Sequence, residues 1–477
     1  MKFVGREREL KALKSEFAAN RAALVVAYGR RRIGKSRLLR EAALGLPEIY
    51  FQATQSVSAI NMEQIKIEIA NVLDASPILD GINTWEAVFH YLADAARVKP
   101  GLILTLDEFP YLVSNDESLP SVLQRFWDSG KPQEGNLKLV LCGSAISQME
   151  DLLAERNPLY GRKTMSLELR QMSLREVGAF FPSYSAEELF KTYATFGGVP
   201  HYLSLCDNDV DLRMNTVNLL LSPTGPLIDE PTNLLQSELR EPGTYSSIIA
   251  AIAEGSLDLS RIGDRLKMST TSLLPYLSKL ERLHIVASVR SLDADPKARN
   301  RRFVLNDHLM RFWHNFVRSN LGAIVAGHGE AVYDHAISGG MSEFMGSAFE
   351  SICLDYSSKH LGEILGVPAS EAGSIWGHAD FDIDIAGRTL DGSFFYGECK
   401  WKSKPFDLSM LMKLRERSEL TKYGGGNESK HYLIFSKSGC THDVARLSEH
   451  DPSVHMISLQ EMAFATRRDV EATMSSS

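Results

Sequence analysis

Apolar positions in the first third of the chain fall into short continuous runs, separated by longer stretches with helical spacing. The runs cover residues 22–28, 48–52, 102–106, 137–142 and 164–169, a length typical of buried strands. Between them, residues 35–44, 59–73, 85–98 and 119–129 have the spacing of helices. Strands that alternate with helices are typical of a parallel sheet covered by helices, so this region is predicted to be an α/β domain.

The pattern changes twice further along the chain. From residue 174 to about 238 it is helical, with an interruption at residues 197–200. Short helices are predicted at 245–253, 259–267 and 271–283, followed by a pair of strands at 285–289 and 301–305. Residues 340–465 form a mixed segment with strands of their own. With 477 residues, the chain is long enough for about three domains of roughly 100–200 residues.

Composition narrows the class of protein. The longest apolar runs are far shorter than the roughly 20 residues that span a bilayer, and residues 1–20 lack the apolar core of a signal peptide. The five cysteines have neither metal-ligand nor disulfide spacing, so reduced thiols in the cytoplasm are expected and no membrane partner is. A net charge of −8 excludes a uniformly basic nucleic-acid coat but leaves room for a local basic surface.

A phosphate-binding loop is the strongest local motif. It follows an apolar run, opens a predicted helix and matches GxxxxGK[ST] with Gly29, Arg30, Arg31, Arg32, Ile33, Gly34, Lys35 and Ser36. Glycines let successive backbone N–H groups point at phosphate oxygens, and the helix N-terminus adds positive potential. Lys35 would reach the β- and γ-phosphates, and the Ser36 hydroxyl would bind Mg²⁺. A chance glycine-rich turn is the alternative.

A second motif supports this interpretation. The run at 102–106 ends in Asp107 and Glu108, where Asp107 can bind Mg²⁺ and Glu108 can polarise an attacking water. Ser144 follows the next apolar run, where its hydroxyl could hydrogen-bond the lytic water or the γ-phosphate. An ordinary strand-end turn at Ser144 is nearly as compatible with the sequence.

Residues 3–10, which include Gly5 and Arg6, resemble the N-terminal box of AAA+ and STAND-type ATPases, which lies over the adenine. Residues 159–162 and 197–203 are similar to the archaeal-type ATPase family. The resemblance implies ATP hydrolysis by a P-loop domain with a helical lid. It makes Arg162 a candidate arginine finger and brings Gly198 and Pro200 near the nucleotide.

Simpler roles stay open for these positions. Arg162 could pair with Glu155 or Glu168 at the surface, and the turn at 198–200 could end a helix without touching a ligand. The triple arginine at 30–32 departs from the usual loop and could contact phosphate or a neighbouring subunit.

The helices and strand pair between 239 and 310 have the order of a winged helix-turn-helix. The tip and return strand of the strand pair carry Lys297, Arg299, Arg301 and Arg302, which suit contact with DNA phosphates. A solvated loop on a protein-interaction module is an equally good explanation.

A second group of candidate catalytic residues is predicted near the C-terminus. Asp384 lies on one expected strand, and Glu398 and Lys400 share a face of the next. Strict two-residue pairing around Asp391 and Gly392 would set Asp384 against position 399, on the wrong face, so convergence requires a loop or bulge that shifts the register by one. Two carboxylates and a lysine can hold one or two divalent ions and steady developing phosphate charge.

This group looks like the PD-(D/E)xK motif of restriction-endonuclease-like nucleases. Glu350 on the preceding predicted helix matches the additional acidic metal ligand of many such enzymes. The segment is also similar to the uncharacterised domain that often follows archaeal-type ATPases with a winged helix. An edge hairpin with a surface Glu398–Lys400 ion pair is the structural alternative. Lys413, Arg415 and Arg417 on a helix from about 407 to 420 could accommodate a nucleic-acid backbone, although a solvated face is as plausible.

Together these features predict an α/β protein with a P-loop AAA+-like parallel sheet and helical lid, a winged helix-turn-helix and a restriction-endonuclease-like domain. The expected boundaries are 1–172 for the ATPase core, 173–238 for the lid, 239–310 for the winged helix, 311–339 for a connector, 340–465 for the nuclease-like domain and 466–477 for a tail.

The leading functional hypothesis is an ATP-controlled DNA nuclease that uses ATP and Mg²⁺, with Mn²⁺ possible at the nuclease-like site. The alternative is a nucleotide-dependent switch that binds DNA or a protein partner and uses its last domain for docking. An arginine finger would require a homo-oligomer, whereas STAND switches can be monomers.

Overall fold

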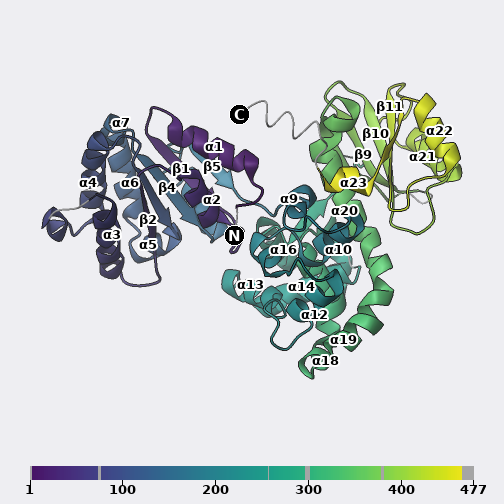
Figure 1. Cartoon of the computed structure of the whole chain (residues 1–477), viewed down its shortest axis with the longest axis horizontal. Coiled ribbons are helices and arrows are strands. Elements are labelled where there is room, and N and C mark those ends of the chain that lie inside the picture. Colours follow the sequence, from purple (N-terminus) through teal and green to yellow (C-terminus); the bar gives the residue numbers. More distant parts are fainter. Residues whose placement is uncertain (1–2, 74–76, 256, 296–300, 378–380, 465–477) are drawn as a thin grey trace. The chain divides into compact units, whose positions relative to one another are not determined.

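The chain folds into two compact units in a computed structural model that describes residues 3–73, 77–255, 257–295, 301–377 and 381–464 (Figure 1). The first unit comprises the described residues of Met1–Gln171 together with Val199–His201. The second comprises Met172–Gly198 and the described residues of Tyr202–Ser477. The segment predicted as a lid therefore belongs to the second unit, apart from Val199–His201.

A five-stranded parallel sheet forms the centre of the first unit, in the order β2-β3-β4-β1-β5. The strands are β1 (Ala23–Tyr28), β2 (Glu48–Gln52), β3 (Ile103–Asp107), β4 (Lys138–Gly143) and β5 (Met165–Glu168). β3 and β4 are buried along their whole length, as is expected of inner strands covered on both faces. The sequence prediction of a parallel α/β sheet is confirmed.

Helices connect these strands, and most of them bury an apolar stripe in the core. They are α1 (Glu7–Ala18), α2 (Lys35–Ala42), α3 (Ser58–Leu73), α4 (Trp85–Val98), α5 (Phe109–Asn115), α6 (Leu119–Asp128), α7 (Lys131–Glu134) and α8 (Ile146–Leu153).

The second unit begins with helices and a two-stranded hairpin. The helices are α9 (Leu174–Gly178), α10 (Ala186–Phe196), α11 (Pro200–Leu205), which starts in the first unit, α12 (Leu212–Leu220), α13 (Glu230–Glu238), α14 (Pro242–Ala253), α15 (Leu259–Leu266) and α16 (Thr270–Arg282). The antiparallel strands are β6 (Val286–Val289) and β7 (Arg302–Leu305). Ser269 caps α16 by accepting a hydrogen bond from Ser272 N at 3.1 Å, which begins this helix just after the predicted turn.

The segment that follows β6 is attached to the C-terminal sheet. Leu292 N donates to Ser374 O at 3.0 Å, and Trp376 N donates to Ser291 Oγ at 2.9 Å. Thr421 Oγ1 donates to Asp293 Oδ2 at 3.1 Å. This part of the predicted wing tip is therefore packed against the protein, and Lys297 and Arg299 lie outside the described residues.

The predicted connector at 311–339 is helical over most of its length. It contains the end of α17 (His308–Phe312), α18 (Leu321–Val325), α19 (Gly329–Val332) and two π-helical turns, Trp313–Val317 and Tyr333–Ile337. Trp313 Nε1 donates to Ile228 O at 2.7 Å, so the segment is packed against the preceding helices. The long helix α20 (Ser338–Leu365) follows.

The C-terminal sheet has the order β12-β11-β10-β9-β8. Its strands are β8 (Ala369–Ile375), β9 (Ile383–Thr389), β10 (Phe394–Lys400), β11 (Lys430–Ser436) and β12 (Val454–Ile457). β8, β9 and β10 pair antiparallel, whereas β10, β11 and β12 pair parallel. The remaining helices are α21 (Leu408–Leu420), α22 (His442–His450) and α23 (Leu459–Ala463). Over the described residues, no helix combines the length and apolar character needed to cross a bilayer.

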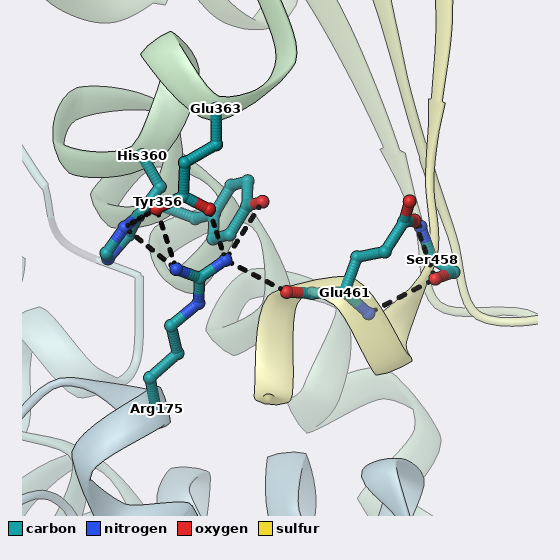
Figure 2. A network of polar contacts seen from close by, with 6 residues as sticks. All are labelled: Arg175, Tyr356, His360, Glu363, Ser458 and Glu461. Carbon is teal, nitrogen blue, oxygen red and sulfur yellow. Dashed lines mark hydrogen bonds and ion pairs between the residues drawn. The ribbon is translucent and has the colours of Figure 1, made fainter. Parts of the chain in front are cut away.

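One arginine ties the start of the second unit to the helices of its C-terminal part (Figure 2). Arg175 on α9 forms a two-pronged ion pair with Glu363 on α20, at 2.7 and 2.6 Å. Its guanidinium also contacts His360 Nδ1 at 3.1 Å and donates to Glu461 O on α23 at 3.1 Å. A planar guanidinium has the donors to hold several acceptors at once, so α9, α20 and α23 are fixed together at this point.

Replacing Arg175 with alanine should destabilise the second unit by about 1.5–3 kcal/mol, since hydrogen bonds to charged groups would be lost from a poorly exposed place. The Arg175 side chain is 12% exposed, whereas that of Arg213, which makes a similar two-pronged pair with Asp334, is 31% exposed. Arg213→Ala should therefore lower the stability clearly less than Arg175→Ala does, because solvent screens the exposed pair. Calorimetric melting of the full chain would measure both, and equal losses would contradict the argument.

Candidate functional site

The phosphate-binding motif forms a tight loop between β1 and α2. Gly29 and Gly34 have φ angles of 153° and 93°, which L side chains rarely adopt, and a Cβ on Gly29 would collide with Leu169 O. Lys35 Nζ lies inside the loop and donates to Gly29 O at 2.7 Å and Arg30 O at 3.1 Å. The loop therefore has the curled form that phosphate binding requires.

The predicted N-terminal box contacts the phosphate-binding loop through the side chain of Arg6. Arg6 is 4% exposed and donates to Ile33 O at 3.3 Å and to Arg170 O. Gly5 and Arg6 both have left-handed backbones, with φ angles of 68° and 60°. In this structure the Arg6 side chain joins the loop to the end of β5.

The three arginines of the loop have different surroundings. Arg30 is buried, whereas Arg31 and Arg32 are exposed. Arg31 Nη2 donates to Tyr111 OH at 3.3 Å.

The carboxyl ends of the parallel strands bring the second motif to the loop. Ser36 Oγ donates to Asp107 Oδ2 at 2.7 Å, although 71 positions separate the two residues. Tyr50 OH donates to the same carboxylate oxygen, and Glu108 N donates to Asp107 Oδ1 at 2.9 Å. Burial acts to raise the pKa of Asp107, but hydrogen bonds from Tyr50, Cys142 and Ser36 outweigh it and lower that pKa.

Glu108 and Ser144 form a pair beside this carboxylate. Ser144 Oγ lies 2.9 and 2.8 Å from the two oxygens of Glu108, and Ser144 N donates to Oε2 at 3.1 Å. Glu108 has a left-handed backbone, with φ 53°, at the start of α5. The sequence assigned Ser144 to water or phosphate, and in this structure it contacts the predicted base instead.

Arg162, the predicted arginine finger, forms an ion pair in this structure. Arg162 makes a two-pronged pair with Asp128, at 2.8 and 2.7 Å, and not with Glu155 or Glu168 as its structural alternative proposed. This hydrogen-bonded pair lowers the pKa of Asp128. The roles predicted for Arg162 stay predictions.

The turn near residue 200 has two parts with different environments. A Cβ on Gly34 would lie 3.6 Å from Pro200 Cγ, so this proline is next to the phosphate-binding loop. Gly198 instead packs on backbone: its carbonyl accepts from Met172 N at 2.8 Å, and a Cβ would collide with Met172 O. Close packing gives a physical reason for glycine at 198.

Two contributors to the site were missed by sequence reasoning. Tyr50 lies on β2, next to β3 in the sheet, and Cys142 lies on β4. Neither belongs to a motif, and only the strand order places them beside Asp107. A prediction of the strand order would have placed both residues beside Asp107.

The second predicted site depends on the register of the β9–β10 hairpin. Phe394 pairs with Arg388 and Gly397 with Ile385. Continuing this register by one residue places Asp384 opposite Glu398, which is the one-residue shift that the sequence required for convergence. The loop between Thr389 and Ser393 has three residues in place of two, which accounts for the shift.

Charged side chains converge on this hairpin. Lys400 Nζ lies 2.5 Å from Glu398 Oε1 and 3.9 Å from Asp384 Oδ2. Arg417 on α21 lies 3.3 Å from Glu398 Oε2. Asp384 Oδ2 also accepts from Cys399 N at 2.8 Å. The Glu398–Lys400 pair is thus part of a wider charged group in which Asp384 takes part.

Buried carboxylates in this group repel one another. Burial and the charge of Glu398 raise the pKa of Asp384 to about 6. Burial and the charge of Asp384 raise the pKa of Glu350, on α20, to about 7. Such a group can hold a proton near neutral pH or bind a cation.

Divalent cations suit the donors at both sites. Mg²⁺ is commonly held by one or two protein oxygens, together with water and substrate phosphates. Ser36 with Asp107, and Asp384 with Glu398, are donors of this kind. Within the described ranges, no group of three or more His, Cys, Asp and Glu side chains is placed to hold a metal. Any ion would therefore need water or substrate to complete its coordination.

Replacing Tyr50 with phenylalanine should weaken Mg²⁺-dependent nucleotide binding by about tenfold, because the hydroxyl that orients Asp107 would be lost. Tyr276→Phe is the matched control, since that hydroxyl also donates to a carboxylate, Glu241, but lies in the second unit. Titration of Mg²⁺ against a fluorescent ATP analogue would test this. An unchanged Mg²⁺ midpoint in Tyr50→Phe would contradict the role given to Tyr50.

Residues 3–206 match the profile of an ATPase domain found predominantly in Archaea, and residues 313–417 match a family of archaeal and bacterial proteins of unknown function. An uncharacterized protein of Methanocaldococcus jannaschii, MJECL04, is 29% identical over 446 residues, which cover 91% of this chain and 95% of that protein. The similarity therefore extends over both units.

One solved structure has a similar fold over 65% of this chain. The Walker-type ATPase PABY2304 of Pyrococcus abyssi has a TM-score of 0.51 and 19% identity, over 65% of this chain and 96% of its own. The ORC2 protein of Aeropyrum pernix, solved in ADPNP–ADP complexes, has a TM-score of 0.35 and 15% identity, over 69% of this chain and 95% of its own. The matched profile and the geometry of the loop agree on a P-loop ATPase domain in the first unit.

Proposed function

We propose that this chain hydrolyses ATP with Mg²⁺ in its first unit, and that nucleotide state controls a metal-dependent DNA nuclease site in its second unit. The observation that carries the first part is the 2.7 Å hydrogen bond between Ser36 and Asp107 beside the loop that holds Lys35. It joins the two motifs of a P-loop ATPase at one place.

Each residue of the proposed ATPase site has a separate role in hydrolysis. Backbone N–H groups of the loop bind phosphate oxygens, and Lys35 turns from the loop carbonyls to the β- and γ-phosphates. Ser36 and Asp107 would hold Mg²⁺, which neutralises phosphate charge when bound. Glu108 accepts a proton from the attacking water. Ser144 keeps the Glu108 carboxylate in one orientation, and a ligand that draws Ser144 away would free it.

Further nucleotide contacts are assigned on the resemblance and on proximity. Pro200 is the better supported of the two turn residues, because it lies next to Gly34. Arg162 would act as an arginine finger on a neighbouring subunit after leaving Asp128, so this role requires a homo-oligomer.

The nuclease proposal rests on the convergence of Asp384, Glu398 and Lys400. Asp384 and Glu398 would hold Mg²⁺ or Mn²⁺, which supplies Lewis-acid stabilisation when bound. Glu350, which the resemblance made a further ligand, adds negative charge near this pair. Lys400 places a positive charge where the phosphodiester gains negative charge. Burial, and then repulsion between the carboxylates, raises the pKa of Asp384 and Glu350, and a bound cation would relieve the repulsion, which supports the proposal.

The alternative function is a nucleotide-dependent switch whose C-terminal part docks a partner. It is favoured by the two cations, Lys400 and Arg417, that already neutralise Glu398. In this alternative α14–α16 with β6–β7 act as a winged helix that binds DNA or a protein in the cytoplasm, as in STAND-type switches.

Glu108→Gln should lower ATP turnover by about 10²–10⁴-fold and leave ATP binding intact, because the amide cannot accept the proton. Glu117→Gln is the control, as Glu117 is exposed at the end of the turn after α5. Phosphate release and binding of a fluorescent ATP analogue would be measured together. Turnover near the wild-type rate would remove Glu108 as the base.

Glu398→Gln should abolish Mg²⁺- or Mn²⁺-dependent cleavage of a DNA panel, because a carboxylate that binds the ion would be lost. ATP turnover should be unchanged, and Glu428→Gln, at an exposed position, should cleave normally. Lys35→Ala should alter cleavage if nucleotide controls it. Absence of cleavage by the wild-type protein under every condition, with ATP turnover intact, would favour the docking alternative.

A further inference from the structure

A cavity of about 760 Å³ lies within the second unit, beside the predicted nuclease residues. Glu350 and Asp384 line it together with Arg302, which belongs to the basic cluster of the predicted wing, and Trp376. Arg302 comes from β7 of the hairpin, and Trp376 directly follows β8 of the C-terminal sheet. The cavity thus connects the hairpin to the acidic group.

Among the described residues, the Arg302 side chain contacts an aromatic ring and pairs with no carboxylate. Its guanidinium carbon lies 4.0 Å from the centre of the Trp376 ring. Across the part of the chain that the structure describes, Arg302 makes no ion pair, in contrast to Arg175, Arg213 and Arg417. Its charge and N–H donors therefore lack an acidic partner.

Trp376 supplies a second donor without an acceptor. Its Nε1 atom is buried and has no hydrogen-bond partner among the described residues. The backbone of Trp376 is held beside the hairpin segment, because Trp376 N donates to Ser291 Oγ at 2.9 Å. A buried N–H without a partner costs stability, so an acceptor from a ligand would be stabilising here.

The other cation of the cavity is already engaged. Arg311 donates to Leu305 O and, at 3.3 Å, to Ser347 O. Arg302 and the Trp376 N–H thus keep donor capacity for a ligand. A cation and an uncharged donor side by side suit an anion rich in oxygen acceptors, and a phosphate is such a group.

The size of the cavity restricts the form of the phosphate ligand. A volume of about 760 Å³ is within the range of small-molecule pockets, which fits a nucleotide-sized group better than a duplex. Single-stranded nucleic acids bind through cations that follow the backbone and through aromatic rings that contact bases. Arg302 and Trp376 provide both kinds of group beside Asp384.

We propose that Arg302 and Trp376 form a phosphodiester subsite that seats a single DNA strand in this cavity and leads it to Asp384. The subsite rests on the proposed nuclease function for its purpose, but binding at it can be measured without cleavage. It also gives β7 a role different from that of a free wing, because Arg302 faces the cavity with Trp376.

The test is fluorescence anisotropy of a short labelled oligothymidylate with the full-length protein, in EDTA and without ATP. Arg302→Ala should weaken binding by about tenfold or more, since a charge-assisted hydrogen bond would be lost. Arg301→Ala is the matched control, because Arg301 is the exposed neighbour of Arg302 and does not line the cavity. It should change the affinity by less than about twofold.

Two further measurements address the geometry. Trp376→Phe keeps an aromatic ring beside Arg302 but removes the N–H, so its loss of affinity should be measurable and smaller than that of Arg302→Ala. A duplex of equal length should compete poorly with the single strand. Thermal melting and ATP turnover of Arg302→Ala should match the wild type, which verifies that the variant is folded.

Each opposite result would overturn the proposal: no binding by the wild type, equal affinities of Arg302→Ala and Arg301→Ala, or equal competition by duplex. Failure of the nuclease proposal gives a different result. In that case the wild type would not cleave DNA with Mg²⁺ or Mn²⁺, yet Arg302-dependent binding would persist, including in Glu398→Gln.

Discussion

The nucleotide site depends on the parallel alignment of β1, β4 and β3. Tyr28 at the end of β1 pairs with Gly143 on β4, and Leu106 on β3 pairs with Leu141 on β4. These pairings bring the phosphate-binding loop and Asp107 to the same edge of the sheet. A slip of one residue would turn the buried side chains of these strands to the other face, so packing of the core fixes the register and, through it, the Ser36–Asp107 contact.

In the C-terminal sheet, a short loop determines in a comparable way which charged side chains face one another. Thr389 N donates to Ser393 O at 2.9 Å across the end of the hairpin, and Gly392 has the left-handed φ of 93° that the loop needs. This three-residue loop puts Asp384 opposite Glu398. The consequence is electrostatic, because burial and the facing charge of Glu398 raise the pKa of Asp384, and Lys400 and Arg417 offset only part of that effect.

The sequence predicted those features that depend on neighbours along the chain. Strand β2 and helix α4 have the predicted bounds, because apolar periodicity is a local property. The loop at Lys35 and the carboxylate at Asp107 were found because motif and strand end coincide. The partners of Arg175 and Arg302 were not predicted, since Glu363 and Trp376 are distant in sequence and lie on elements whose packing no periodicity specifies. The helices of the predicted connector were not predicted either. This segment packs against a part of the chain that lies much earlier in the sequence.

Nucleotide control of the second unit requires a physical connection to the phosphate-binding loop, and the chain itself provides one. Pro200, next to Gly34, belongs to the first unit, while Gly198 and Tyr202 on either side of it belong to the second. A displacement of Pro200 by bound nucleotide would therefore act on the ends of α10 and α11 through covalent bonds. Gly198 is packed on the backbone of Met172, close in sequence to Arg175, which is paired with the same helix α20 that carries Glu350. Under the proposed control, a ligand would shift this system only by the difference in its affinity for two arrangements. Tight packing between Gly198 and α20 would then determine how much of that difference reaches the acidic group.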